Sequence, residues 1–351
     1  MRHFGCGECP LYVLALLIPL TFLIPNSTQA QLAFNISSTG NQDVDDGFQM
    51  AADFWSARYN DDVTINIDAG FEDLGGSVLG SSRNVSTNYN FSTFRNRMLA
   101  NIVTEDDQTF VDALPGGTSF TAYANNSFGN PNGTGPYTAS NLTNVFINRS
   151  NAKALGLIDG QDTQSDSTIT FNNTFAFDFD PSDGINAGQL DFVGIAIHEI
   201  GHTMGFTSSV DFIAAVGDQL PISSLGPSIL DFSRFSPDSV AAGTFDLTSD
   251  TRAKFFSIDG GVTAAAPGLN HWSLGGANDG RQASHWKDNL GLGIMDPTAA
   301  PRGQLNIATE LDFMAIDILG WDRVAVVPEP GSLLFIAAFG IGTCLRRRRS
   351  I

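Results

Sequence analysis

The feature that most constrains this chain is an apolar segment, residues 192–204, that carries two histidines. His198 and His202 lie four residues apart, so on a helix both imidazoles project from the same face, one turn apart, and can bind one metal ion. The pattern predicts a helix over 192–204, and Gly205 follows it at a typical C-terminal position. Two solvated histidines on a helix face are the alternative interpretation.

Glu199 stands between the two histidines in the sequence His198-Glu199-Ile200-Gly201-His202. In this pattern the glutamate points toward an open coordination position, where it can act as general base when water attacks an amide. Zinc is the expected metal, because it acidifies water and polarises a substrate carbonyl. We therefore predict a zinc site with Glu199 as the catalytic residue.

Zinc requires a third protein ligand, and few residues qualify. The chain has five histidines. His3 falls in residues 1–30, which are predicted below to be a signal peptide, so only His271 and His285 remain beside the helical pair. A glutamate ligand is disfavoured because the next glutamate after Glu199 is Glu310. Asp211 follows the helix closely and is within reach. The residues alone leave these alternatives open.

The stretch His198-Glu199-x-x-His202-x-x-Gly205 resembles the metzincin metalloproteases. Three residues after the glycine, where the usual metzincin has its third histidine, this chain has Ser208. Leishmanolysin-like metzincins place an insertion there, followed by Ser-His-Trp and the methionine of the Met-turn. The chain matches with Ser284-His285-Trp286 and then Gly293-Ile294-Met295. The resemblance implies that His285 is the third ligand, that Met295 is the Met-turn residue beneath the metal, and that Gly205 marks the turn after the helix.

The resemblance also implies an α+β, metzincin-like zincin with two lobes around an active-site cleft and a mixed sheet in the upper lobe. Its domain would span residues 31–326, with an upper lobe at about 31–206 and a lower lobe at about 207–326. The match is convincing over about 174–322, and it extends to a family of metalloproteases with a PEP-CTERM tail. The tyrosine ligand of astacin-like members has no counterpart after Met295.

Periodicity predicts several other elements. Apolar residues at helical spacing favour helices over 46–58 and 307–319. Strict alternation favours strands over 63–67 and 174–179. Residues 116–145 are rich in Asn, Gly, Ser and Thr and predict a long surface loop.

Both ends indicate processing. Residues 1–30 have the pattern of a secretory signal peptide, with a 14-residue apolar core that is short for a membrane helix. Residues 327–351 resemble the PEP-CTERM sorting tail of exported bacterial proteins: Val-Pro-Glu-Pro-Gly, an apolar run and four arginines. Such a tail implies transient membrane contact and cleavage by an exosortase-like peptidase. A single-pass anchor is the alternative at either end. All three cysteines, at positions 6, 9 and 344, lie in these segments.

Acidic residues outnumber basic ones, 37 to 18, for a formal charge of −19. This balance excludes a nucleic-acid binder, because no basic face is available for phosphates. Two acidic clusters are candidates for calcium ligands, although neither has EF-hand spacing. They consist of Asp43, Asp45 and Asp46, and of Asp178, Asp180 and Asp183.

The sequence predicts an exported zinc metalloendopeptidase at the cell surface or outside a Gram-negative-type bacterium, acting on proteins or peptides. A surface structural or adhesive protein that keeps the fold without proteolysis is the main rival. A zinc hydrolase acting on a non-peptide amide is a second. The intact Glu199 argues against a purely structural metal site.

Overall fold

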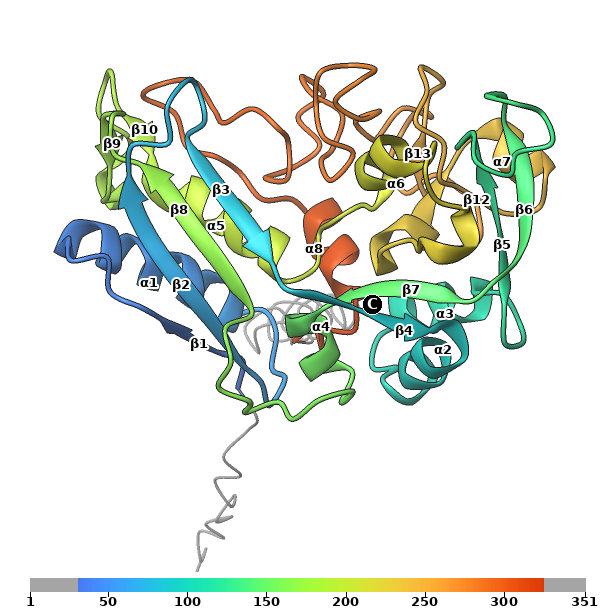
Figure 1. Cartoon of the computed structure of the whole chain (residues 1–351). Coiled ribbons are helices and arrows are strands. Elements are labelled where there is room, and N and C mark those ends of the chain that lie inside the picture. Colours follow the sequence, from blue (N-terminus) through green and yellow to red (C-terminus); the bar gives the residue numbers. More distant parts are fainter. Residues whose placement is uncertain (1–30, 325–351) are drawn as a thin grey trace, which may run out of the picture.

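The structure is a computed structural model, and it describes residues 31–324 (Figure 1). Its largest sheet has four strands in the order β1-β2-β8-β3. Their bounds are β1 Ala33–Ile36, β2 Thr64–Glu72, β8 Ser167–Asn172 and β3 Gly80–Asn84. The first three strands run parallel, whereas β3 pairs antiparallel with β8. The sheet is therefore mixed, with its antiparallel strand at the end of the order.

Two helices, α1 (Gln42–Ser56) and α5 (Phe192–Thr203), pack against each other and against this sheet. The helix α1 begins at a side-chain cap, because Asn41 accepts hydrogen bonds from the amides of Asp43 and Val44. The rings of Phe48, Phe171 and Phe192 meet where the two helices and β8 converge. Burial of these aromatic side chains fixes α5 beside the sheet.

A second group of short sheets lies on the other side of the molecule (Figure 1). In one of them β5 (Phe120–Ala124) pairs with β6 (Tyr137–Leu142) and with β12 (Phe245–Asp246). A Phe cluster packs beneath it and joins both halves of the sequence: Phe91, Phe94, Phe120, Phe232 and Phe245. This sheet joins segments from either side of residue 206, because β5 and β12 pair directly.

The remaining elements are short. The strands are β4 Ser86–Asn90, β7 Asn144–Asn148, β9 Phe177–Asp178, β10 Leu190–Asp191, β11 Arg234–Phe235 and β13 Phe255–Phe256. The α-helices are α2 Phe91–Ala100, α3 Glu105–Ala113, α4 Arg149–Ala154, α6 Val210–Val216, α7 Pro237–Ala241 and α8 Glu310–Asp317. Three 3-10 turns are η1 Pro181–Asp183, η2 Ile222–Ser224 and η3 Ile229–Ser233. The α+β class predicted from the sequence is confirmed, with several small sheets.

Two local predictions were wrong. The stretch 116–145 is not one loop, because it contains β5 and β6, whose polar outer side chains masked the alternation of buried residues. The expected strand 174–179 forms only the two residues of β9. Its alternating phenylalanines pack against each other and around Phe192 instead of lining a long strand.

The predicted signal peptide and sorting tail lie outside the described residues. Within 31–324, no helix combines the length and apolar character needed to cross a bilayer.

Candidate metal centre

The helix α5 carries the histidine pair and is held at both ends. At its start the buried Asp191 carboxylate accepts the amide of Gly194 at 2.8 Å and also the amide of Asn306 at 2.8 Å. After its end Gly205 has φ +110°, and a Cβ there would lie 2.3 Å from the side-chain oxygen of Asn151. A glycine is therefore required at this turn.

The last carbonyls of α5 have no partners within the helix and take side-chain donors from distant segments. Asn84 Nδ2 donates to the carbonyl of His202 at 2.9 Å, and Ser150 donates to that of Thr203. The carbonyl of Met204 accepts from Asn151 at 2.8 Å and from the Trp321 indole at 2.7 Å. This set of donors fixes the position of His202 relative to β3, α4 and the C-terminal segment.

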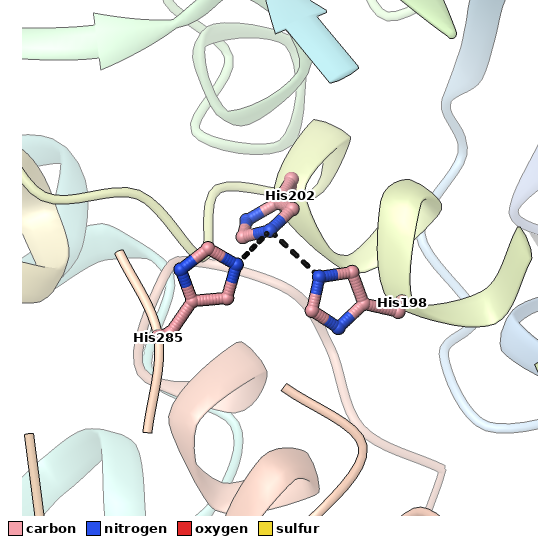
Figure 2. Close-up of side chains that lie close together, drawn as sticks. All are labelled: His198, His202 and His285. Atoms are coloured by element: carbon pink, nitrogen blue, oxygen red, sulfur yellow. Dashed lines mark hydrogen bonds between the residues drawn. The ribbon is translucent and has the colours of Figure 1, made fainter. Parts of the chain in front are cut away.

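Three imidazoles converge at one point (Figure 2). The Nε2 atom of His202 lies 3.1 Å from that of His198 and 3.2 Å from that of His285. Figure 2 shows His198 and His202 projecting from the same helix, with His285 reaching them from a separate segment. His202 and His285 are each only 8% exposed.

The opposite nitrogen of each ring contacts a backbone carbonyl. Nδ1 of His198 lies 2.7 Å from the oxygen of Ile294, Nδ1 of His202 lies 2.7 Å from that of Phe206, and Nδ1 of His285 lies 3.2 Å from that of Gln282. A carbonyl only accepts, so each Nδ1 carries the proton and each Nε2 presents a lone pair. Three lone pairs facing one another repel unless a cation lies among them.

The spacing fits a tetrahedral metal ion. Zn–N bonds of about 2.0 Å at the tetrahedral angle place ligand nitrogens about 3.3 Å apart, close to the separations of 3.1 and 3.2 Å found here. Burial lowers the pKa of all three histidines, and the neighbouring imidazoles lower those of His202 and His285 further, to about 3 for His285. The rings are therefore neutral, which is the form that binds metal.

Glu199 is buried next to the edge strand β3. A Cβ on Gly80 would lie 3.0 Å from Glu199 Oε1, so the absence of a side chain there gives the carboxylate its room. Burial raises the pKa of Glu199 to about 8, and a hydrogen bond from the backbone amide of Ser82 opposes this shift. The carboxyl group lies on the same helix as the two ligand candidates and faces the strand above them.

Met295 lies directly behind the ligand helix. Its side chain is fully buried, and a Cβ on Gly201 would come within 2.6 Å of its Sδ. The backbone of Met295 also contacts Trp286, the residue after His285. The amide of Trp286 donates to the carbonyl of Met295 at 3.0 Å. The predicted Met-turn residue thus packs against α5 and against the segment that carries His285.

The two alternative third ligands lie in other environments. His271 Nδ1 accepts the amide of Phe256 at 3.1 Å, and its Nε2 lies 3.3 Å from the carbonyl of Pro267, so both ring nitrogens contact the backbone. The Asp211 carboxylate accepts the amides of Gly276 at 2.8 Å and Ala283 at 2.6 Å. Asp211 therefore anchors the loop before His285, a contact that the sequence pattern did not predict.

The acidic clusters considered for calcium bind donors of the chain itself. Asp178 accepts the amides of Asp180 and Asn186, and Asp45 accepts the amide of Thr39 together with the hydroxyls of Ser38 and Thr39. Within residues 31–324, the three histidines are the one group of His, Cys, Asp or Glu side chains with metal-ligand spacing.

The buried cluster of His198, His202 and His285 has the geometry to bind a metal ion. Comparisons of the chain with protein-family models, with curated proteins and with solved structures gave no match.

Proposed function

We propose that this protein is a metzincin-like zinc metalloendopeptidase. The observation that supports it most is the convergence of three neutral imidazoles on one point, each with its lone pair turned inward by a carbonyl at Nδ1. His198, His202 and His285 would hold the ion, which leaves a fourth position for water or substrate, as in catalytic zinc sites.

The chemistry divides between the ion and the chain. When bound, zinc supplies a Lewis acid that polarises the scissile carbonyl and acidifies water. Glu199 takes the proton from the attacking water and passes it to the leaving nitrogen. Burial raises the pKa of Glu199 to about 8, and a cation bound nearby would lower it, so that the carboxylate is ionised and can accept the proton of the attacking water.

The edge strand β3 offers a place for an extended peptide. It stands last in the order β1-β2-β8-β3 and packs against α5, and the amide of Ser82 approaches the Glu199 carboxylate. A substrate strand laid along this edge would bring its backbone past the general base, with main-chain pairing giving affinity for proteins and peptides. The sequence did not identify this strand.

The export signal and the tail complete the proposal. Residues 1–30 and 327–351 carry the patterns of a secretory signal and of a PEP-CTERM tail. These patterns support an enzyme that acts at the cell surface or outside the cell, after transient membrane contact and cleavage by an exosortase-like peptidase.

The test compares hydrolysis of casein by the purified protein and by Glu199→Gln, with the bound zinc of each sample measured. The account predicts that Glu199→Gln loses about 10²- to 10⁴-fold in rate, the usual contribution of a general base, and keeps its zinc. The control is Glu310→Gln, which makes the same substitution at an exposed glutamate whose partner is Arg323. Wild-type protein that carries zinc and cleaves no protein would contradict the proposal and favour the structural rival.

A further inference from the structure

Asp312 is a fully buried carboxylate that accepts hydrogen bonds from three separate segments. Its Oδ1 accepts the Trp286 indole at 2.8 Å and the amide of Met295 at 3.2 Å. Its Oδ2 accepts the amide of Ile294 at 2.9 Å and that of Thr309 at 2.7 Å. Four N–H groups donate to the two oxygens, which fits an ionised carboxylate. An amide has only one acceptor oxygen and could not replace it.

One of these contacts reaches His198 through a single peptide group. The peptide between Ile294 and Met295 donates its N–H to Asp312 and accepts His198 Nδ1 at its carbonyl, 2.7 Å away. Hydrogen bonds in such a chain polarise one another, so the carboxylate strengthens the acceptor that orients the imidazole.

Another contact reaches His285. The neighbouring Trp286 donates its indole N–H to Asp312, and its backbone amide bonds to Met295. The ring is fully buried among Phe206, Phe256 and Trp272. Fixing this ring fixes the backbone from which His285 projects.

We infer that Asp312 is a positioning residue for the metal centre. It holds His198 in place through the 294–295 peptide and His285 in place through Trp286. The inference rests on the proposed metal site. Backbone partners of this kind fix the tautomer and orientation of ligating histidines, and their loss typically weakens metal binding by about 10- to 100-fold.

A purely structural role makes a different prediction. Asp312 is the third residue of α8 and forms a capping box with Thr309. Asp107 has the same place in α3: it is buried, forms a capping box with Thr104, and accepts the amides of Val103 and Thr104. Asp107→Asn is therefore a matched control that loses the cap without touching the histidines.

The experiment measures zinc affinity by competition with a chelator, and the visible spectrum of the Co²⁺ form, for the full-length purified protein and its variants. We expect Asp312→Asn to bind zinc about 10- to 100-fold more weakly and to shift the Co²⁺ spectrum. Asp107→Asn should match the wild type in both. Equal zinc affinity and equal spectra for Asp312→Asn and wild type would overturn the inference, whereas a wild type that binds no zinc would refute the proposed function itself.

If Asp312→Asn does not fold, a second pair of variants tests the inference. Trp286→Phe removes the indole N–H and keeps most of the ring. Trp272→Phe is its control, because among residues 31–324 the Trp272 indole N–H has no hydrogen-bond partner, and its ring packs on Trp286. Zinc affinity should fall by about 10-fold for Trp286→Phe alone. Equal affinities for the two variants would overturn the inference.

Discussion

At the scale of single residues, the candidate metal site depends on two glycines. Gly201 lies between the two helical histidines, and its missing Cβ makes room for Met295. Gly293 does the same for Asp312, whose Oδ2 would lie 2.1 Å from an added Cβ. At both places a side chain packs closely against the backbone. The short loop at 293–295 can therefore support both His198 and His285.

Gly201→Ala should destabilise the protein. The new methyl group would meet the Met295 sulfur at 2.6 Å, and overpacking of this kind costs about 1–3 kcal/mol. Thermal unfolding of the metal-free protein measures the effect. Gly116→Ala is the control, since a Cβ added there would have no atom within 4 Å. Equal unfolding temperatures for the two variants would show that Met295 moves freely and does not support α5.

The sequence could point to the histidines that cluster but not to what orients them. His198 and His202 followed from spacing alone, because helix geometry is local. The choice of His285 over His271 needed the resemblance, since both histidines precede a tryptophan. Asp211, Asp312 and the Ile294 carbonyl at His198 Nδ1 act across long sequence separations, and a lone aspartate in a sequence carries no signal of such a contact.

At the scale of elements, α3, α8 and the turn after α1 bring buried carboxylates together. Burial, and then the Asp322 carboxylate, raise the pKa of Asp61 to about 7. Burial, and then the Asp107 carboxylate, raise that of Asp317 to about 7. In the unfolded chain these groups titrate near the ordinary value of about 4. The folded state therefore binds more protons between these two values.

This difference predicts how stability depends on pH. The contribution of these groups is fully present below about pH 4 and is lost as the pH rises to about 7, because the folded state must then ionise buried acids. Relative to wild type, Asp61→Asn should therefore gain more than about 1.4 kcal/mol, the value of one pKa unit, between pH 5 and pH 8. Chemical unfolding at both pH values measures the change.

The control is Asp43→Asn, which replaces an exposed acid in α1. Because this side chain is exposed, its replacement should change stability little at either pH. A pH-independent difference for Asp61→Asn as well would show that Asp61 is ionised in the folded protein at pH 5.

The elements themselves were predicted unevenly. The helix expected over 192–204 is present as α5 because its apolar pattern is continuous and ends at a glycine. The helices expected over 46–58 and 307–319 are present as α1 and α8, with shifted ends. The strands β5, β6 and β8 were missed, since their buried residues alternate with Thr, Ser and Asn that are typical of loops.

At the scale of the whole molecule, the candidate metal centre joins two distant parts of the chain. The pair on α5 and His285 are separated by more than eighty residues that form α6, α7 and several short strands. This intervening chain follows no simple periodicity, because its folding depends on a mixed aromatic and polar core. The α+β class could be predicted from the sequence, but the pairing of β12 with β5 could not.

The central claim is that His198, His202 and His285 bind one metal ion. The most direct measurement is the zinc content of the purified wild type, His285→Asn and His271→Asn after dialysis against a weak chelator. We expect about one zinc ion per chain, as in a three-histidine site, for the wild type and for His271→Asn, and almost none for His285→Asn. Zinc retained by His285→Asn, or no zinc in the wild type, would contradict the account.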